Sequence, residues 1–268
     1  MNITLPDGSV RELKTGSTGL DLAMDIGPGL AKAAIAVNVN GDQKDLSDPI
    51  NKDSEVSIIT IDSSEGLEIM RHTLTAQVLA RAVKNLYPDS KLAIGPTITD
   101  GFYYDFEFKK PISPDDLPKI EKEMKKIIDL KSSITKSLHS RDDAVNIFKE
   151  NAESYKESII EESDQVDNFQ LYYQDDKEFV DLCRGPHLPS LKHIGSFKLT
   201  KLAGAYWKGD SKNKMLTRIY GTAWKNDKDL NAHLHSIEEA EKRDHRKLGK
   251  EMKLFHFQEE APGGASLV

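Results

Sequence analysis

The residues best suited to chemistry lie in one short stretch, from Asp181 to His187. Cys183 is the only cysteine in the chain, and three residues separate it from His187. Gly185 and Pro186 predict a turn between the two, which can bring the thiol and the imidazole to one place. Such a pair can support nucleophilic catalysis, metal ligation or proton transfer. Taken alone, the stretch fits a small buried cysteine near a loop histidine equally well.

Composition limits the kinds of protein this can be. The 268 residues are enough for about two domains, and 38% of them are hydrophobic, which suffices for real cores. One cysteine excludes an internal disulfide and fits a reducing compartment. The N-terminus lacks the pattern of a signal peptide, and no apolar run approaches the roughly 20 residues that span a bilayer. We therefore expect a soluble cytoplasmic protein without membrane contact. The net charge of −7 argues against nonspecific nucleic-acid binding by the whole surface but permits a local basic groove.

Residues 1–62 show the pattern of a small α+β module. A hairpin turning at Asp7-Gly8 comes first, and a helix that ends at Gly27 follows it. Two apolar strands complete the module, at Ile35–Val39 and Val56–Ile61. The order β-β-α-β-β predicts a ubiquitin-like β-grasp domain.

The second region, residues 63–225, begins at the polar stretch Asp62–Gly66, which predicts a hinge and a domain boundary. Apolar residues at helical spacing predict a helix from about Glu65 to Leu86, and His72 lies on it. Further predicted elements are helices at 113–130 and 140–150 and strands at 92–96, 101–106, 171–173, 197–199, 203–207 and 215–220. We therefore predict an α+β domain with a mostly antiparallel sheet, followed by a charged linker helix over residues 226–254.

Seven strings, in their order and spacing, resemble the N-terminal half of bacterial threonyl-tRNA synthetases. They are Leu92–Pro96, Gly101–Asp105, Glu153–Lys156, Asp181–His187, Gly204–Asp210, Arg218–Trp224 and Lys242–Gly249. The resemblance implies a TGS domain over residues 1–62 and an editing domain over 63–225, of the threonyl- and alanyl-tRNA synthetase second additional domain type. It also implies a linker helix over 226–254 and a cut-off start of the class II catalytic domain over 255–268.

The same resemblance implies proofreading rather than aminoacylation, because no class II motif for ATP binding or adenylate formation is present. ATP and zinc are expected only for the absent catalytic core. A homodimer is expected only for a full-length enzyme, so we expect this chain to be a monomer. A site for threonine rejects serine poorly, since one methyl group supplies only about 1–3 kcal/mol of discrimination. The implied reaction is therefore hydrolysis of the seryl ester at the 3′-terminal adenosine of tRNA(Thr).

The resemblance assigns catalytic roles to five residues. They are His72, Lys156, Asp181, Cys183 and His187. Cys183 and His187 match a C-x-x-x-H pair, and Lys156 matches a lysine that positions water and stabilises charge. Without the resemblance, Lys156 is an ordinary surface lysine and Asp181 an ordinary turn aspartate.

The helical part of the pocket departs from the family pattern of two histidines four residues apart. Counted from His72, the second place is Ala76; counted back from Pro88, it is Gln77, and the helix has one extra residue. Five residues turn a regular helix by about 140°, so His72 and Gln77 share a face only across a π-bulge. The alternative is that the second histidine has been lost, and we expect weakened editing.

Substrate contacts are expected from a second group of residues. They are Tyr172, Gln77, Tyr206, Trp207, Lys208 and Arg218. Tyr173 competes with Tyr172 for its assignment, because the segment before Cys183 is about two residues longer than the family pattern. Basic residues interleaved with aromatic ones suit phosphate contact and stacking on an unpaired 3′ end. They equally suit a solvated hairpin face.

A metal site is the last possibility that these residues raise. His72, Cys183 and His187 could supply three zinc ligands, as a similar set does in related alanyl editing domains. The resemblance to threonyl editing domains implies a water-based site, so we expect no metal. Two other interpretations stay open: a non-catalytic tRNA-binding module or editing-impaired fragment, and an unrelated metal-dependent hydrolase.

Overall fold

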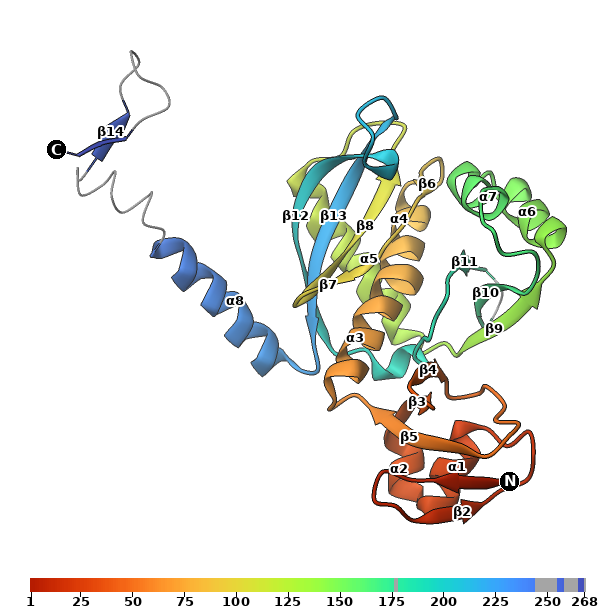
Figure 1. Cartoon of the computed structure of the whole chain (residues 1–268). Helices are drawn as coiled ribbons and strands as arrows, with labels where there is room; N and C mark the ends of the chain where they lie inside the picture. The colour runs from red at the N-terminus through yellow and green to blue at the C-terminus, as the bar shows by residue number, and fades with distance from the viewer. Residues whose placement is uncertain (176–177, 244–254, 258–264, 268) are drawn as a thin grey trace. The chain divides into compact units, whose positions relative to one another are not determined.

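The computed structural model describes residues 1–175, 178–243, 255–257 and 265–267, and it divides the chain into two compact units, residues 1–225 and 226–268 (Figure 1). The described residues combine helices with mainly antiparallel sheets, which confirms the α+β prediction. Among them, no helix combines the length and apolar character needed to cross a membrane.

The N-terminal domain is a five-stranded sheet with two short helices. Its elements are β1 (Asn2–Thr4), β2 (Val10–Glu12), α1 (Gly19–Ile26), α2 (Pro28–Ala33), β3 (Ala34–Val39), β4 (Asp42–Asp45) and β5 (Ser54–Thr60). The strand order is β2-β1-β5-β3-β4, with β1 parallel to β5 and the other pairs antiparallel. Thr18 caps α1 in a capping box with Asp21, and Gly27 ends the helix. The predicted β-grasp order is confirmed, with α2 and β4 in addition.

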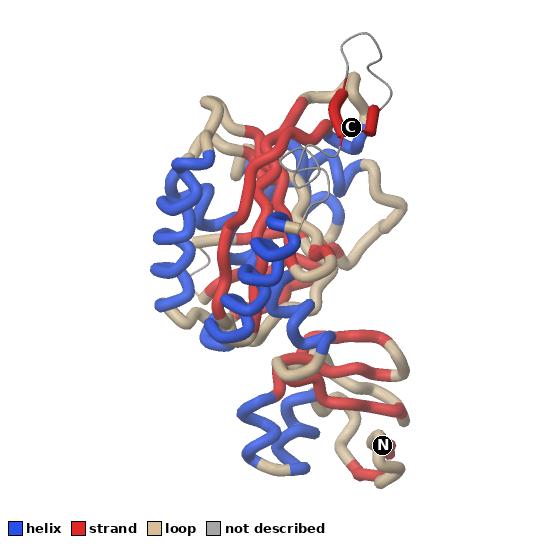
Figure 2. Tube along the Cα trace, turned by 90° about the vertical axis from the view of Figure 1, so that its left-hand side faces the viewer, coloured by secondary structure: helices blue, strands red, loops and turns tan. Residues whose placement is uncertain are grey.

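The larger sheet of the second domain has the order β12-β13-β8-β6, with β7 also paired to β8. Its strands are β6 (Lys91–Leu92), β7 (Thr97–Ile98), β8 (Gly101–Glu107), β12 (Ser196–Tyr206) and β13 (Met215–Trp224), all antiparallel, and Figure 2 shows the long ones side by side. Phe102, Tyr104 and Phe106 alternate along β8 and are fully buried. They share one core with helices that precede and follow this strand. Those helices are α3 (Ser64–Thr73), α4 (Ala80–Leu86) and α5 (Leu117–Asp129), the last preceded by a 3₁₀ turn at η2 (Pro114–Asp116).

The predicted helix from Glu65 to Leu86 forms, with a π-helical segment inside it. This segment, η1 (Leu74–Leu79), joins α3 to α4 without a break. The backbone N–H of Ala80 donates to the carbonyl of Thr75, five residues earlier, instead of four. The helix therefore absorbs one extra residue, as the count from Pro88 predicted.

A smaller antiparallel sheet, ordered β11-β10-β9, carries the chemistry-bearing stretch. Its strands are β9 (Ile134–His139), β10 (Phe169–Gln174) and β11 (Val180–Leu182). Two helices share a core with β10, namely α6 (Arg141–Glu150), capped by Ser140, and α7 (Ser154–Glu161). Helix α7, on which Lys156 lies, was not predicted from the sequence. A 3₁₀ turn, η3 (Leu191–His193), leads into β12.

The second unit contains α8 (Asp227–Lys242) and the antiparallel pair β14 (Phe255–Phe257) and β15 (Ala265–Leu267). The first part of the predicted linker helix is thus confirmed. Its continuation over residues 244–254, and residues 258–264 and 268 of the predicted catalytic-domain start, lie outside the described residues.

The stretch Asp62–Gly66 is not the hinge that its polarity predicted. Ser63 caps α3 by accepting a hydrogen bond from the Gly66 backbone N–H at 3.0 Å. The Cα of Gly66 lies so close to β5 that an added Cβ would sit 1.9 Å from the Thr60 carbonyl oxygen. Residues of both domains, including Ile59 and Met70, belong to one apolar core. The polar side chains thus cap a helix between two packed domains.

We predict that Gly66→Ala destabilises the protein. The new methyl group cannot fit beside the Thr60 carbonyl without moving α3 or β5, which costs about 1–3 kcal/mol. Gly29→Ala is the matched control, because nothing lies within 4 Å of its added Cβ and Gly29 is in helix α2. Alanine should stabilise that site by up to about 1 kcal/mol. Urea unfolding monitored by circular dichroism measures both, and equal stabilities of the two variants would contradict the prediction.

Candidate active site

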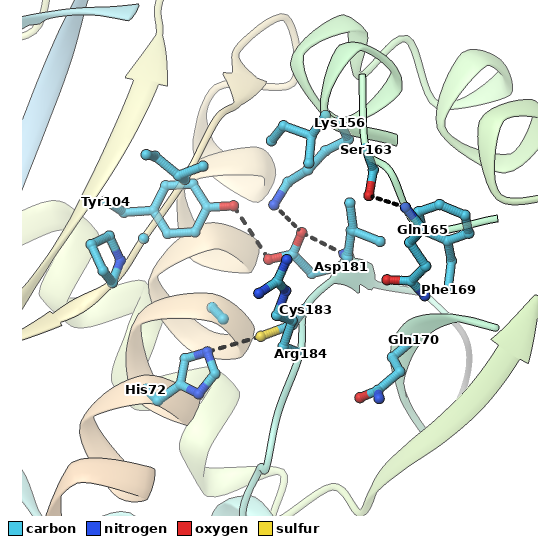
Figure 3. Close-up of a pocket in the computed structure, with 16 residues that line it drawn as sticks. His72, Tyr104, Lys156, Ser163, Gln165, Phe169, Gln170, Asp181, Cys183 and Arg184 are labelled. Carbon is cyan, nitrogen blue, oxygen red and sulfur yellow. Dashed lines mark hydrogen bonds and ion pairs between the residues drawn. The ribbon is translucent and has the colours of Figure 1, made fainter. Parts of the chain in front are cut away.

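A cavity of about 410 Å³ lies between the helix that carries His72 and the smaller sheet. Its walls also include the segment between β6 and β7 and helix α7 (Figure 3). The lining residues are His72, Ala76, Ile94, Gly95, Pro96, Tyr104, Lys156, Ile159, Ser163, Gln165, Phe169, Gln170, Asp181, Leu182, Cys183 and Arg184. Four of the five expected catalytic residues therefore line one cavity, which has the size of a small-molecule site.

Lys156 and Asp181 form a buried ion pair in the wall of this cavity. The Nζ of Lys156 lies 2.6 Å from Oδ1 of Asp181, and the two side chains are only 4% and 2% exposed. The same carboxylate accepts hydrogen bonds from the Leu182 backbone N–H at 2.8 Å and from the Tyr104 hydroxyl at 3.3 Å. Burial raises the pKa of Asp181, and the Lys156 ammonium opposes that rise. The pair fixes the ammonium at the cavity wall and leaves it further N–H bonds to donate.

Cys183 and His72 form a second pair on the cavity wall. The Sγ of Cys183 lies 2.8 Å from Nε2 of His72 (Figure 3). Burial lowers the pKa of His72 below its ordinary value, so the imidazole is neutral at pH 7. A hydrogen bond donated by the imidazole to the Pro186 carbonyl opposes this shift. Nε2 faces the Cys183 thiol, so Nδ1 is the nitrogen left to donate to Pro186, and Nε2 is the one that can accept a proton.

His187 lies immediately behind His72. The two rings stack with their centroids 4.6 Å apart, and His187 is 2% exposed. The Thr73 hydroxyl donates to the Ile69 carbonyl and accepts from the Leu188 backbone N–H, so at 3.1 Å it accepts from Nδ1 of His187. Nε2 of His187 is then the unprotonated nitrogen, and it has no hydrogen-bond partner among the described residues.

The two tyrosines that competed for one role both lie outside the cavity lining. Tyr172 is buried behind the site, and its ring packs edge-on against that of His187, with the centroids 4.4 Å apart. Its hydroxyl donates to Oδ2 of Asp45, in the N-terminal domain, at 2.7 Å. Tyr173 points to the other face of β10, where its hydroxyl lies 3.3 Å from Nε2 of His139. Phe169 and Gln170 of the same strand line the cavity instead.

Gln77 does not reach the cavity, and Ala76 takes the place four residues after His72. The backbone carbonyl of Gln77 accepts from Nε2 of Gln174 at 2.7 Å, and its own side chain is fully buried. The π-helical segment thus accommodates the extra residue without turning Gln77 towards His72. The Gln77 side chain therefore lies on the core side of the helix and not at the cavity, where it was expected to contact substrate.

The four expected contact residues of the β12–β13 hairpin also lie outside the cavity lining. Trp207, in the 3₁₀ turn η4 (Trp207–Gly209), packs edge-on against Tyr155 of α7 at 4.8 Å. Lys208 pairs with Glu162, while the Arg218 guanidinium forms two hydrogen bonds with Asp105 at 2.7 and 2.8 Å. Tyr206 is 40% exposed. Both basic groups are thus already paired with acids, which favours the solvated-face interpretation for them.

Three residues at the site were not assigned roles from sequence. Tyr104 donates to the site carboxylate, and its position on β8 gave no signal beyond an apolar strand. Arg184 is exposed, lines the cavity, and makes no ion pair or hydrogen bond with the described part of the chain. Its position next to Cys183 could have indicated it from the sequence. Asp45 contacts the site from the N-terminal domain, and nothing in the sequence indicates a contact between residues so far apart along the chain.

One group of residues could hold a metal ion. Ligand atoms of His72, Cys183 and His187 all lie within 4.8 Å of one another. The two nitrogens are neutral acceptors in the tautomers above, as metal binding requires. The carboxylate of Asp181 is paired with Lys156 and is not available as a fourth ligand. A metal here would therefore have three protein ligands and one open coordination position.

Two protein families match this chain. The TGS domain matches residues 1–60, and the threonyl and alanyl tRNA synthetase second additional domain matches residues 170–220. The second match covers β10, β11 and the stretch with Asp181, Cys183 and His187.

Whole-chain relatives agree with these matches. The chain is 57% identical over 261 residues to the threonine–tRNA ligase of Hahella chejuensis and 54% identical over 261 residues to that of Prochlorococcus marinus. It is 55% identical over 263 residues to the corresponding ligase of Paramagnetospirillum magneticum. These matches cover 97% of this chain and 40%, 40% and 41% of the relatives, so the chain spans about two fifths of their length. The chain therefore carries a TGS domain followed by a second additional domain of the threonyl- and alanyl-tRNA synthetase type, and nearly all of it is similar to about two fifths of these threonine–tRNA ligases.

Proposed function

We propose that the cavity hydrolyses the ester bond of seryl-tRNA(Thr), so that serine attached in error is removed. The observation that carries this proposal is the meeting of two polar pairs, Lys156–Asp181 and His72–Cys183, on the wall of one cavity. The likeness to threonine–tRNA ligases supplies the substrate class, since their amino-acid site must separate threonine from serine by one methyl group.

Each pair supplies a different requirement of ester hydrolysis. The neutral His72 can accept a proton from an attacking water through Nε2, with the Cys183 thiol within hydrogen-bond reach. Lys156, held by Asp181, can donate to the carbonyl oxygen as it gains negative charge. The water adds to the acyl carbon, the bond to the ribose oxygen breaks, and that oxygen takes up the proton. Serine and uncharged tRNA leave.

Ala76 favours a second candidate, a module that binds tRNA without editing it. A methyl group stands four residues after His72, where the family pattern has another histidine, so the helix offers one imidazole to the cavity. With a single helical base, the rate depends more strongly on His72, and the weakened or absent editing expected from the sequence remains an alternative.

The proposed partner is tRNA(Thr), held by its 3′-terminal adenosine, and the proposed location is the cytoplasm. A lone cysteine that is free supports a reducing compartment. For a whole ligase we propose aminoacylation, ATP binding, a zinc ion in the catalytic core and dimer formation. These properties concern residues other than those of this site.

We predict that the 268-residue chain deacylates seryl-tRNA(Thr) and that Cys183→Ala and His187→Ala each lower the rate constant by about 100-fold, because the first removes the hydrogen bond to His72 and the second removes the ring stacked on it. Single-turnover release of labelled serine measures the rate. His235→Ala is the matched control, because His235 is exposed on α8.

A wild-type rate equal to the protein-free rate would exclude the hydrolase. Retained tRNA binding in that case would establish the non-catalytic module. Melting temperatures of the variants separate loss of chemistry from loss of fold.

We further predict that this hydrolysis requires no metal. The side chains of His72 and Cys183 are hydrogen-bonded to each other, and Lys156 already supplies the positive charge that a metal would bring to the carbonyl. The rate should be the same before and after dialysis against a chelator, and elemental analysis should find less than stoichiometric zinc. Loss of activity with chelator and its recovery with zinc would favour the metal-dependent hydrolase instead.

Arg184 is proposed to contact a phosphate at the 3′ end of the tRNA. Lys156 is neutralised by Asp181 and His72 is uncharged, so Arg184 is the cation at the cavity whose charge is unmatched among the described residues. A guanidinium at the exposed edge of a cavity suits bidentate binding of a phosphate.

We predict that Arg184→Ala weakens tRNA binding and makes the slope of log Kd against log salt shallower by about one. Filter binding at a series of salt concentrations gives the slope. Arg11→Ala, an exposed arginine on β2, should leave the slope unchanged. Identical slopes for Arg184→Ala and the wild type would rule out a phosphate contact.

A further inference from the structure

One carboxylate of the TGS domain reaches into the support of the editing cavity. Asp45, at the end of β4, is 7% exposed and accepts three hydrogen bonds or ion pairs from the second domain. Its Oδ1 accepts from the His187 backbone N–H at 2.8 Å. Its Oδ2 lies 2.7 Å from the Tyr172 hydroxyl and 2.9 Å from the Lys136 Nζ.

These three donors surround the turn that carries both Cys183 and His187. Lys136 and Tyr172 are paired across β9 and β10, and Tyr172 is in turn paired with Asp181 on β11. Asp45 therefore contacts the sheet and the turn at the place where they meet behind the cavity. Burial and the Asp45 charge raise the pKa of Tyr172, which keeps its hydroxyl protonated as a donor.

The turn itself leaves no space for rearrangement. Gly185 has a φ of +66°, and a Cβ there would sit 2.0 Å from the Tyr172 hydroxyl and 3.6 Å from Oδ2 of Asp45. The Tyr172 ring also rests edge-on against the His187 ring. The backbone between Cys183 and His187 is thus held from behind by Tyr172, and Tyr172 is held by Asp45.

The energetics make Asp45 hard to replace. A buried carboxylate is stable only while its donors are in place, and the donors are left unpaired when it is removed. Asparagine has nearly the same shape, but its NH₂ group would face Lys136 or the Tyr172 hydroxyl instead of accepting from both. A misplacement of about 1 Å at a catalytic group can cost about 100-fold in rate.

We infer that Asp45 is a positioning residue of the editing site, through which the TGS domain holds Cys183 and His187 in register with His72. This inference rests on the proposed hydrolysis for its kinetic consequence, whereas its geometric consequence concerns the turn alone. A residue of the TGS domain would then influence the reaction in the neighbouring domain, in addition to its role in the TGS fold.

Asp48 provides a matched control on the same domain. It also pairs with Lys136, at 2.5 Å, but among the described residues it makes no hydrogen bond to Tyr172 or to the turn around His187. Asp48→Asn therefore removes an interdomain ion pair and leaves the support of the turn intact. Asp45→Asn removes both.

The experiment compares the two variants with the wild-type chain by two readouts. The first is single-turnover deacylation of seryl-tRNA(Thr), with KM obtained separately. Asp45→Asn should lower the rate constant of the chemical step by about 100-fold with little change in KM, while Asp48→Asn should change it by less than about threefold. The second is alkylation of Cys183 by iodoacetamide, which reports on this turn alone because the chain has no other thiol.

The alkylation rate should rise several-fold in Asp45→Asn, since the turn is no longer held, and stay at the wild-type value in Asp48→Asn. Equal alkylation rates for Asp45→Asn and the wild type would overturn the inference, as would equal losses of activity in both variants. A wild type without deacylation would remove the proposed hydrolysis, and the alkylation comparison would still decide the role of Asp45.

Discussion

The buried ion pair between Lys156 and Asp181 is the constraint on which the cavity depends. It joins helix α7 to strand β11, and both side chains are almost completely shielded from water. Breaking such a pair by removing one partner costs about 3–5 kcal/mol, because the other charge stays buried. Apolar residues of similar volume often stabilise a fold as well as a buried ion pair does, so stability alone does not account for this pair in a cavity wall. Its two partners lie on different elements, and their contact holds α7 against the smaller sheet at the cavity wall.

The opposite wall of the cavity is the long helix α3–η1–α4, which contains one residue more than a regular α-helix would accommodate in register. The π-helical segment η1 confines the extra residue to one turn, so that α3 and α4 both keep their apolar faces in the same core. His72 and Ala76 remain four residues apart and both line the cavity. Gln77 is then directed to Gln174 on β10, where it ties the helix to the smaller sheet. The π-helical segment thus links the long helix to the smaller sheet, and the small side chain of Ala76 lines the cavity.

Local patterns in the sequence were sufficient for most of the elements and for only part of the site. Apolar spacing and capping residues predicted the helices that Ser140 caps and that follow Ser63. The long hairpin was predicted in part, because its first strand was divided into 197–199 and 203–207, whereas β12 runs unbroken from Ser196 to Tyr206. Helix α7 was missed because its apolar face is short and Pro or Gly do not mark its ends. The turn around Gly185 correctly brought Cys183 and His187 together, but the thiol is bonded to His72, 111 residues away. Contacts of that kind depend on how sheets and helices stack, and spacing along the chain carries no information about them.

Asp45 illustrates the same limit across two domains. In the sequence it is one of several acids in a polar segment after a strand, 142 residues from the backbone N–H that it accepts. Nothing in that segment distinguishes it from Asp48, and only the tertiary structure separates a residue that anchors the domains from one that also supports the turn. Because Ile59 of the TGS domain and Met70 of the editing domain share a core, the two modules fold against each other as well as bonding through Asp45. The boundary predicted from the polar stretch Asp62–Gly66 therefore separates two folds, but these pack together as one compact unit. The cavity is built by both, since the second domain lines it and Asp45 of the first bonds to the turn behind it.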